Sequence, residues 1–192
     1  MKLSITEEKE KLCGKIYTEN MEKNLKKVKT GESGSRKVIL ALHNIRSTHN
    51  VGAIFRTADA VGISEIFLIG ITPDPVDRFG RKRSDIAKAA LGAEETILWQ
   101  HFSDEKFLEK VSVLKEEGFK IISIEQGANS VDYKSVEVEA KNLIIVGNEV
   151  DGLPKEVTDI SDFVAEIPMF GEKESLNVSV ATGVVLFRIL GI

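Results

Sequence analysis

The sequence contains few of the residues from which disulfide bonds and metal sites are built. Its 192 residues include one cysteine, Cys13, and three histidines. A single cysteine excludes an internal disulfide bond, and three histidines without recognisable ligand spacing argue against a metal site. We therefore interpret Cys13 as an incidental thiol and expect no metal in the functional site.

Long apolar runs are also missing. No stretch of the sequence reaches the roughly 20 apolar residues of a membrane-spanning helix, and residues 1–8 lack the apolar region of a signal peptide. The composition, with 42% hydrophobic and 29% charged residues, is that of one compact domain with a proper core. We expect a cytoplasmic protein.

Two familiar nucleotide-binding motifs are absent. Gly147 and Gly152 have the spacing of a phosphate-binding loop, but Leu153 and Pro154 stand where that loop has a lysine and a hydroxyl residue. The Gly-x-Gly-x-x-Gly pattern does not follow the first expected strand either. A nucleotide bound by this chain would have to be held in another way.

An excess of positive charge is missing too, since the net charge is -4. This argues weakly against nucleic acid, because affinity for phosphates comes largely from lysine and arginine. The basic residues nevertheless gather in two groups. A solvated helix face explains the first group equally well; it consists of Lys23, Lys26, Lys27, Lys29, Arg36 and Lys37. The better candidate for RNA binding surrounds Phe79 and consists of Arg78, Arg81, Lys82, Arg83 and Lys88.

Hydrophobic periodicity predicts alternating strands and helices. Short apolar runs predict strands at 38–42, 65–69, 120–124 and 143–146, another that starts near 99, and a strand end near 167. Helical spacing of apolar residues predicts helices at 51–61, 107–114 and 175–190, and a short helix that ends near 91. This alternation favours an α/β fold with a parallel sheet covered by helices on both faces. Residues 1–36 read as a lysine-rich helical arm and linker, and residues 37–192 as the main domain.

The last expected helix is apolar almost all round, so it should have more than one neighbour. One apolar stripe is formed by Leu176, Val180, Val184 and Phe187. Ser179, Thr182 and Gly183 form a small-residue face that another backbone could approach. One chain could bury this helix alone, but we favour a second subunit.

The segment before this helix carries unusual polar residues. We expect Pro168 to end a strand, Gly171 to adopt a positive φ and Ser175 to cap the helix. Asn177 would then be an amide inside an apolar helix. Taken alone, an idle amide bonded to the backbone explains Asn177 about as well as a functional one.

Three segments of this polar character occur in the chain, at 44–58, 145–154 and 167–181. Together, in this order, they resemble the three sequence motifs of the SpoU family of SPOUT RNA methyltransferases, the TrmH-like 2′-O-ribose enzymes. The resemblance covers about residues 38–190. It implies a deep C-terminal trefoil knot whose loops enclose S-adenosylmethionine, and a homodimer with the site shared across its interface.

The resemblance also implies roles for individual residues. The predicted cofactor-binding residues are Ile124, Gly147, Ile167, Met169, Ser175 and Leu176. Aliphatic walls and close backbone suit adenine, although Ile124 and Leu176 alone would look like ordinary core. The predicted catalytic residues are Arg56, Asn50, Glu149, Ser175 and Asn177.

Arg56 is the family's catalytic candidate, and we expect it on the helix face beside Asn50, six residues earlier. A guanidinium with a pKa above about 12 scarcely deprotonates near neutrality, so we assign it to binding the target phosphate and stabilising the oxyanion, with the proton taken by phosphate or water. Glu149 should orient Arg56 or the loop. Asn50, Ser175 and Asn177 should fix the ribose and the loop geometry.

These observations predict an S-adenosylmethionine-dependent RNA 2′-O-methyltransferase that acts on tRNA or rRNA. The sequence does not choose between these substrates or name the nucleotide. A non-catalytic RNA-binding relative is a rival, but such a relative would be expected to have lost Arg56 or Asn177. The second rival is another α/β nucleotide-binding enzyme, which would bind NAD or ATP.

Overall fold

The computed structural model describes residues 36–192. The predicted lysine-rich arm and Cys13 lie outside the described residues. Within the described part, no helix combines the length and the apolarity needed to cross a membrane.

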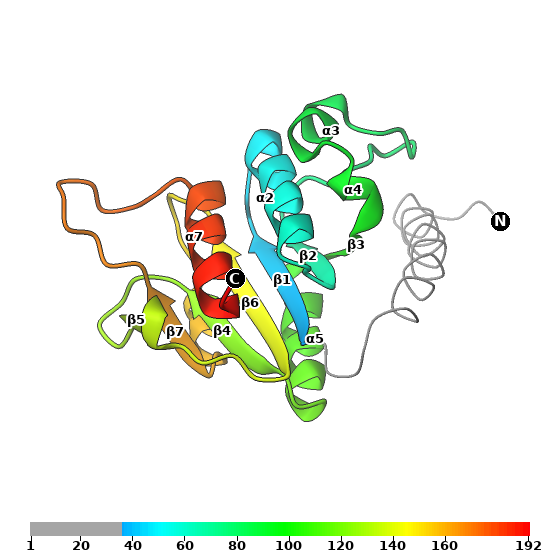
Figure 1. Ribbon diagram of the computed structural model, residues 1–192. Coiled ribbons are helices and arrows are strands. Elements are labelled where there is room, and N and C mark those ends of the chain that lie inside the picture. Colours follow the sequence, from blue (N-terminus) through cyan, green and yellow to red (C-terminus); the bar gives the residue numbers. More distant parts are fainter. Residues whose placement is uncertain (1–35) are drawn as a thin grey trace.

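Within residues 36–192, seven strands form one sheet in the order β3-β2-β1-β6-β4-β7-β5, and every neighbouring pair is parallel (Figure 1). The strands are β1 (Lys37–His43), β2 (Glu65–Ile69), β3 (Leu98–Phe102), β4 (Lys120–Ile124), β5 (Val131–Asp132), β6 (Lys141–Gly147) and β7 (Phe163–Glu166). The central strands β1, β2 and β6 are almost continuously buried, as expected for parallel strands covered on both faces. The predicted parallel sheet is therefore confirmed. The exposed edge strand β5 was not predicted.

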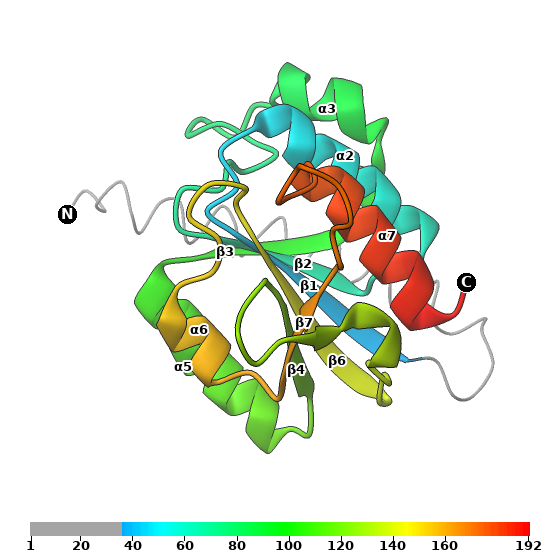
Figure 2. The same cartoon turned by 90° about the vertical axis from the view of Figure 1, so that its left-hand side faces the viewer.

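Helices cover both faces of this sheet. They are α2 (Thr48–Ala60), α3 (Ser84–Ala90), α4 (Ala93–Thr96), α5 (Asp104–Glu116), α6 (Lys155–Asp159) and α7 (Val178–Leu190), with a 3-10 turn at Tyr133–Ser135. Figure 2 shows α5 and α6 on one face, and α2, α3 and α7 on the other. Strand β1 feeds both layers, because Leu40 packs into the α2 and α7 side and Ile39 into the α5 and α6 side. This alternation is the two-residue period of a strand.

Two expectations for the segment before α7 were wrong. The helix begins at Val178, and its N-cap is Asn177, whose side chain accepts a hydrogen bond from the Ser179 N–H at 3.0 Å. Ser175 lies before the cap, so Asn177 is not an interior amide. Gly171 does not adopt a positive φ, because the chain makes a wide excursion here and not a tight turn.

Among the residues that the structure describes, helix α7 is covered on one side only. Val185, Leu186 and Ile189 are buried as the helix packs against α2 and β6. Three members of the predicted apolar stripe are exposed, at 52% for Val180, 37% for Val184 and 42% for Phe187, whereas Thr182 of the small-residue face is fully buried. Burial of the whole helix within one chain is therefore excluded for the part of the chain that the structure describes.

Candidate functional site

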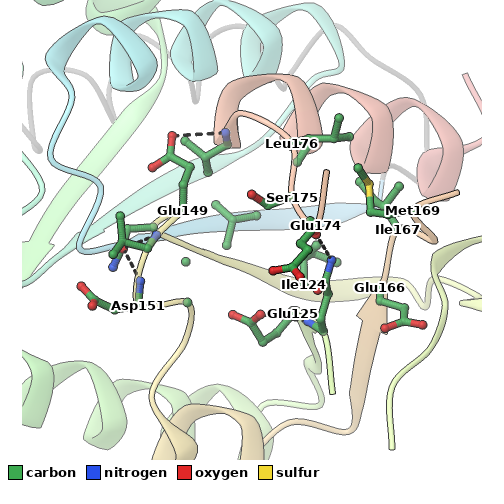
Figure 3. Close-up of a pocket in the computed structure, with 18 residues that line it drawn as sticks. Ile124, Glu125, Glu149, Asp151, Glu166, Ile167, Met169, Glu174, Ser175 and Leu176 are labelled. Carbon is green, nitrogen blue, oxygen red and sulfur yellow. Dashed lines mark hydrogen bonds between the residues drawn. The ribbon is translucent and has the colours of Figure 1, made fainter. Parts of the chain in front are cut away.

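A cavity of about 350 Å³ opens where β4, β6 and β7 end (Figure 3). The carboxyl ends of parallel strands meet at one edge, which is where α/β sheets bind ligands. Loops 148–153 and 167–177 complete its walls. All six residues predicted to bind a cofactor line it, namely Ile124, Gly147, Ile167, Met169, Ser175 and Leu176. Their role as ligands stays a prediction.

Loop 148–153 is folded tightly against the end of β6. The Asn148 side chain, in a residue only 8% exposed, accepts hydrogen bonds from the backbone N–H groups of Val150 at 2.9 Å and Asp151 at 2.8 Å. Gly152 has φ +65°, and a Cβ atom on Gly147 would lie 2.6 Å from the Gly152 carbonyl carbon. No Cβ fits at that distance, so the loop can approach β6 only because residue 147 is glycine.

Glu125 and Gln126, directly after β4, hold both loops, although no sequence motif predicted them. The Glu125 carboxylate accepts hydrogen bonds from the backbone N–H groups of Leu153 at 2.7 Å and Gln126 at 2.9 Å. The Gln126 amide donates to the Glu174 carbonyl at 2.6 Å. The sequence did contain a signal for these two residues. A polar pair directly after a buried strand lies at the sheet edge where the parallel strands end and where ligands bind.

Three predicted catalytic residues from three distant segments meet beside this cavity. Asn50 Nδ2 donates to Glu149 Oε1 at 2.8 Å, and Asn177 Nδ2 donates to Asn50 Oδ1 at 3.2 Å. Glu149 Oε1 also accepts a bond of 3.3 Å from the Val178 backbone N–H. We call Asn50, Glu149 and Asn177 the amide-carboxylate network. It ties the first turn of α2, loop 148–153 and the start of α7 to one another.

Arg56 stands apart from this network. It is exposed on α2 and makes no hydrogen bond or ion pair with another residue of 36–192. Arg56 is six residues after Asn50, so the two side chains point about 120° apart around the helix axis. The side-by-side placement of Arg56 and Asn50 expected from the sequence is therefore wrong. Of the two roles predicted for Glu149, its contacts fit orientation of the loop.

The cavity is strongly acidic. Among the described residues, its lining contains no lysine or arginine and five carboxylates, from Glu125, Glu149, Asp151, Glu166 and Glu174. Three of these make contacts to side chains outside the lining. Glu149 accepts the bond from Asn50 described above, Asp151 pairs with Arg46 at 3.3 Å, and Glu166 accepts a bond of 2.7 Å from Ser130 Oγ. A site of one charge sign concentrates ligands of the opposite sign. The cavity therefore suits a cationic ligand and disfavours a polyphosphate.

The basic group around Phe79 is partly neutralised within the chain. Arg81 pairs with Asp77 at 2.8 Å, and Arg83 with Asp85 at 3.3 Å. Lys82 lies 2.6 Å from Glu95, and the hydrogen bond and charge of this carboxylate raise the pKa of Lys82. The two other basic residues of the group, Arg78 and Lys88, are exposed and have no carboxylate partner within residues 36–192. The group is therefore less positive than its composition implies. No three His, Cys, Asp or Glu of the described part are placed to bind a metal.

Comparison with known proteins places this geometry among RNA-modifying enzymes. A sequence model of the SpoU rRNA Methylase family matches residues 37–187. The chain is 30% identical over 169 residues to the tRNA (guanosine(18)-2′-O)-methyltransferase of Aquifex aeolicus, a match that covers 88% of this chain and 76% of the relative. It is 33% identical over 154 residues to the 23S rRNA (guanosine-2′-O-)-methyltransferase RlmB of Pseudomonas aeruginosa, which covers 80% of this chain and 58% of the relative.

A solved structure agrees in fold as well as in sequence. The AdoMet-bound rRNA methyltransferase from Sinorhizobium meliloti superimposes with a TM-score of 0.71 at 32% identity, over 80% of this chain and 55% of that one. The chain thus spans three quarters of the Aquifex relative but little more than half of the Pseudomonas and Sinorhizobium proteins.

Proposed function

The chain belongs to the SpoU rRNA methylase family, and from this membership we propose that it transfers a methyl group from S-adenosylmethionine to a ribose 2′-hydroxyl of RNA. The observation that carries the proposal is the acidic cavity at the ends of β4, β6 and β7, bordered by the amide-carboxylate network. The relatives named above act on tRNA in one case and on 23S rRNA in the other. Both RNA classes therefore remain candidate substrates.

The cavity lining fits this cofactor better than it fits ATP or NAD. Ile124, Ile167, Met169 and Leu176 offer apolar walls for adenine. The carboxylates around them match the positive sulfonium and ammonium groups, whereas they would repel the phosphates of ATP and NAD. When bound, S-adenosylmethionine supplies an electrophilic methyl group.

We assign Arg56 to the RNA and not to the cofactor. It is exposed and, within residues 36–192, unpaired, so its guanidinium is available to a phosphate or to the oxyanion that develops at the 2′-oxygen. A guanidinium stays protonated near neutrality, so phosphate or water takes the proton. Asn50, Glu149 and Asn177 hold the loops in place, and Ser175 on the cavity wall helps to orient the ribose.

A homodimer is part of the proposal. Val180, Val184 and Phe187 form an exposed apolar stripe on α7, beside the helix α2 that carries Arg56. A second copy packed on this stripe would bring its own Arg56 toward the cavity of the first, which accounts for the separation of Arg56 from the network. Sedimentation of Val184→Lys tests this, since a lysine in the stripe should yield monomers.

We also propose the deep trefoil knot that the family resemblance implies. Its support is the path of the C-terminal segment. After β7, loop 167–177 passes the end of β4, where Gln126 donates to the Glu174 carbonyl at 2.6 Å. Helix α7 then packs on β6 and α2, beside loop 148–153.

Two measurements test the function. Isothermal calorimetry with S-adenosylmethionine, ATP and NAD should give binding for S-adenosylmethionine only, and binding of ATP or NAD alone would favour the rival nucleotide enzyme. Transfer of tritiated methyl groups to total RNA should then separate an enzyme from a non-catalytic RNA-binding relative. Mass spectrometry of nucleosides from tRNA and rRNA, with and without the gene, identifies the substrate.

A further inference from the structure

The loop between β2 and α3 displays a large aromatic side chain on a rigid turn. Phe79 is 65% exposed. Asp77 Oδ1 accepts hydrogen bonds from the backbone N–H groups of Phe79 at 2.8 Å and Arg81 at 3.0 Å, and Asp77 Oδ2 accepts one from Arg81 Nε at 2.8 Å. Gly80 closes the turn with φ +76° and a bond of 2.9 Å from its N–H to the Asp77 carbonyl. The tip is thus held in one conformation with its phenyl ring in solvent.

Two guanidinium groups lie against this ring. The Cζ atoms of Arg78 and Arg81 are 4.8 and 5.0 Å from the Phe79 centroid, within the range of a cation–π interaction. Asp77 fixes Arg81, while Arg78 has no carboxylate partner within the described part of the chain. A phenyl ring and guanidinium planes are the surfaces on which nucleobases stack, and the positive charge attracts the adjoining phosphates.

The position of the tip favours RNA over a protein partner. A second hollow of about 590 Å³ lies at its base, lined by Arg78, Phe79, Arg81 and Arg83 together with residues 70–74, Val76, Asp77 and His101. Strands β2 and β3 end at this hollow, so it shares the sheet edge on which the acidic cavity lies. Arg46, with a side chain 68% exposed, follows the strand between them and contacts Asp151 of the cavity loop. The Phe79 tip, Arg46 and the cavity therefore lie along the same edge of the sheet, so one RNA strand could contact all three.

We propose that Phe79, supported by Arg78 and Arg81, stacks on an unpaired base of the RNA. A base inside a continuous duplex is covered on both faces by its neighbours, so only a loop, bulge or single strand can offer a free face to Phe79. The substrate class is then RNA whose target lies near unpaired nucleotides. This inference rests on the proposed function, because it concerns how the same RNA is held.

A single-stranded oligoadenylate containing 2-aminopurine, whose fluorescence falls on stacking, serves as the probe, and a blunt RNA duplex of equal length as its comparison. Wild-type protein should quench the single strand. Phe79→Leu should weaken binding to it about five- to hundredfold, the range measured for one base stacked on an aromatic side chain. Phe79→Tyr should restore affinity and quenching. Because Phe79 carries no charge, the salt dependence of the remaining binding should not change.

Several results would overturn the proposal. Equal affinity of wild type and Phe79→Leu for the single strand would do so, as would an equal loss on the duplex. If the wild type binds RNA and transfers methyl groups, and Phe79→Leu does both equally well, the stacking proposal fails while the proposed function stands. If wild type binds S-adenosylmethionine but no RNA, the proposed function fails and the stacking site with it.

Discussion

Asn50 Nδ2 donates to Glu149 Oε1 at 2.8 Å, and 99 residues of sequence separate the two side chains. The same carboxylate oxygen receives the first free N–H of α7 from Val178 at 3.3 Å. Asn177, the N-cap of that helix, binds Asn50 in turn. Asn50, Glu149 and Asn177 thus hold one another in place. A substitution at any one of them should displace the other two.

Asn177→Ala removes both the helix cap and the bond to Asn50. Loss of an N-cap costs about 1 kcal/mol, and the loop that lines the cavity loses its anchor to α2. We expect a lower melting temperature, weaker binding of S-adenosylmethionine in calorimetry and little methyl transfer. Asn177→Ser is the matched control, because its hydroxyl can cap the helix but cannot reach Asn50. Normal turnover of Asn177→Ala would show that this amide only starts a helix.

Arg56→Ala should abolish methyl transfer, with a loss of at least about 100-fold, the effect of removing one oxyanion-stabilising donor. Affinity for S-adenosylmethionine should stay within a few fold, because Arg56 lies outside the cavity lining. The melting temperature should not change, since the side chain is exposed. Lys155→Ala on α6, across the sheet, controls for the loss of one positive charge. A matching loss of cofactor affinity would contradict the role given to Arg56.

Gly147→Ala should displace loop 148–153. The added Cβ would lie 2.6 Å from the carbonyl carbon and 2.7 Å from the oxygen of Gly152, and backbone atoms cannot swing aside as a side chain can. Overpacking of this kind costs about 1–3 kcal/mol, so calorimetry should find S-adenosylmethionine bound about five- to hundredfold more weakly. Gly171→Ala is the control in the opposite loop, since its Cβ meets nothing within 4 Å. Equal affinities for the two variants would refute the close approach.

Replacement of Arg78, Arg81 and Arg83 with alanine should weaken RNA binding and flatten its salt dependence. Each lost phosphate contact removes about 0.7–0.9 unit from the slope of log affinity against log salt. Arg78→Ala alone should account for the largest share, because Arg81 and Arg83 are also paired with carboxylates of the chain. Cofactor affinity and sedimentation should stay as in the wild type. An unchanged slope would mean that RNA phosphates bind elsewhere on the protein. Deletion of residues 1–30 would then be the next variant to assay.

The free energy of unfolding should fall as the pH drops below about 6.5, the ordinary histidine value. His43 is 2% exposed, and burial lowers its pKa although Asp104, 3.0 Å from Nε2, partly opposes this. A lowered pKa means that the unfolded chain binds the proton more readily, so stability is full above about 6.5 and is lost toward lower pH. Urea unfolding at several pH values measures this, together with the NMR titration of the His43 ring.

Asp104→Asn separates this histidine from other titrating groups. Without the carboxylate, the pKa of His43 should fall further, and the loss of stability between neutral and acidic pH should grow. His43→Gln should remove this component altogether. A pH dependence that is the same in wild type and His43→Gln would mean that another group causes it.

Sequence patterns predicted most of the sheet, because its central strands are short apolar runs that fit a buried strand better than any other element. The patterns failed at the start of α7, where two nearby residues could each cap the helix. Ser175 and Asn177 are both good N-caps, and Asn177 was chosen by its tertiary bond to Asn50, which no local pattern contains. Strand β5 has only two residues, both exposed, so it has no periodicity to detect.

The cavity residues illustrate the same limit. Gly147 and Met169 were predicted from sequence motifs that each span ten or more positions, and both residues line the cavity. Glu125 and Gln126 lie outside all three motifs, and their importance comes from backbone partners 28 and 48 residues away. Such pairings depend on the order of strands in the sheet, which the sequence alone did not give.

The bond between Asn50 and Asn177 spans 127 residues, and this sets the time at which the cavity can exist. A ribosome releases Asn50 well before Asn177, so a growing chain can build β1, α2 and β2 long before it can close the cavity. Contacts of such long range also form late when a denatured chain refolds, because the loop must lose its entropy before the contact rewards it. A nascent chain would therefore be unable to hold a ligand in this cavity until α7 docks, even though the strand ends that form the floor of the cavity are already in place.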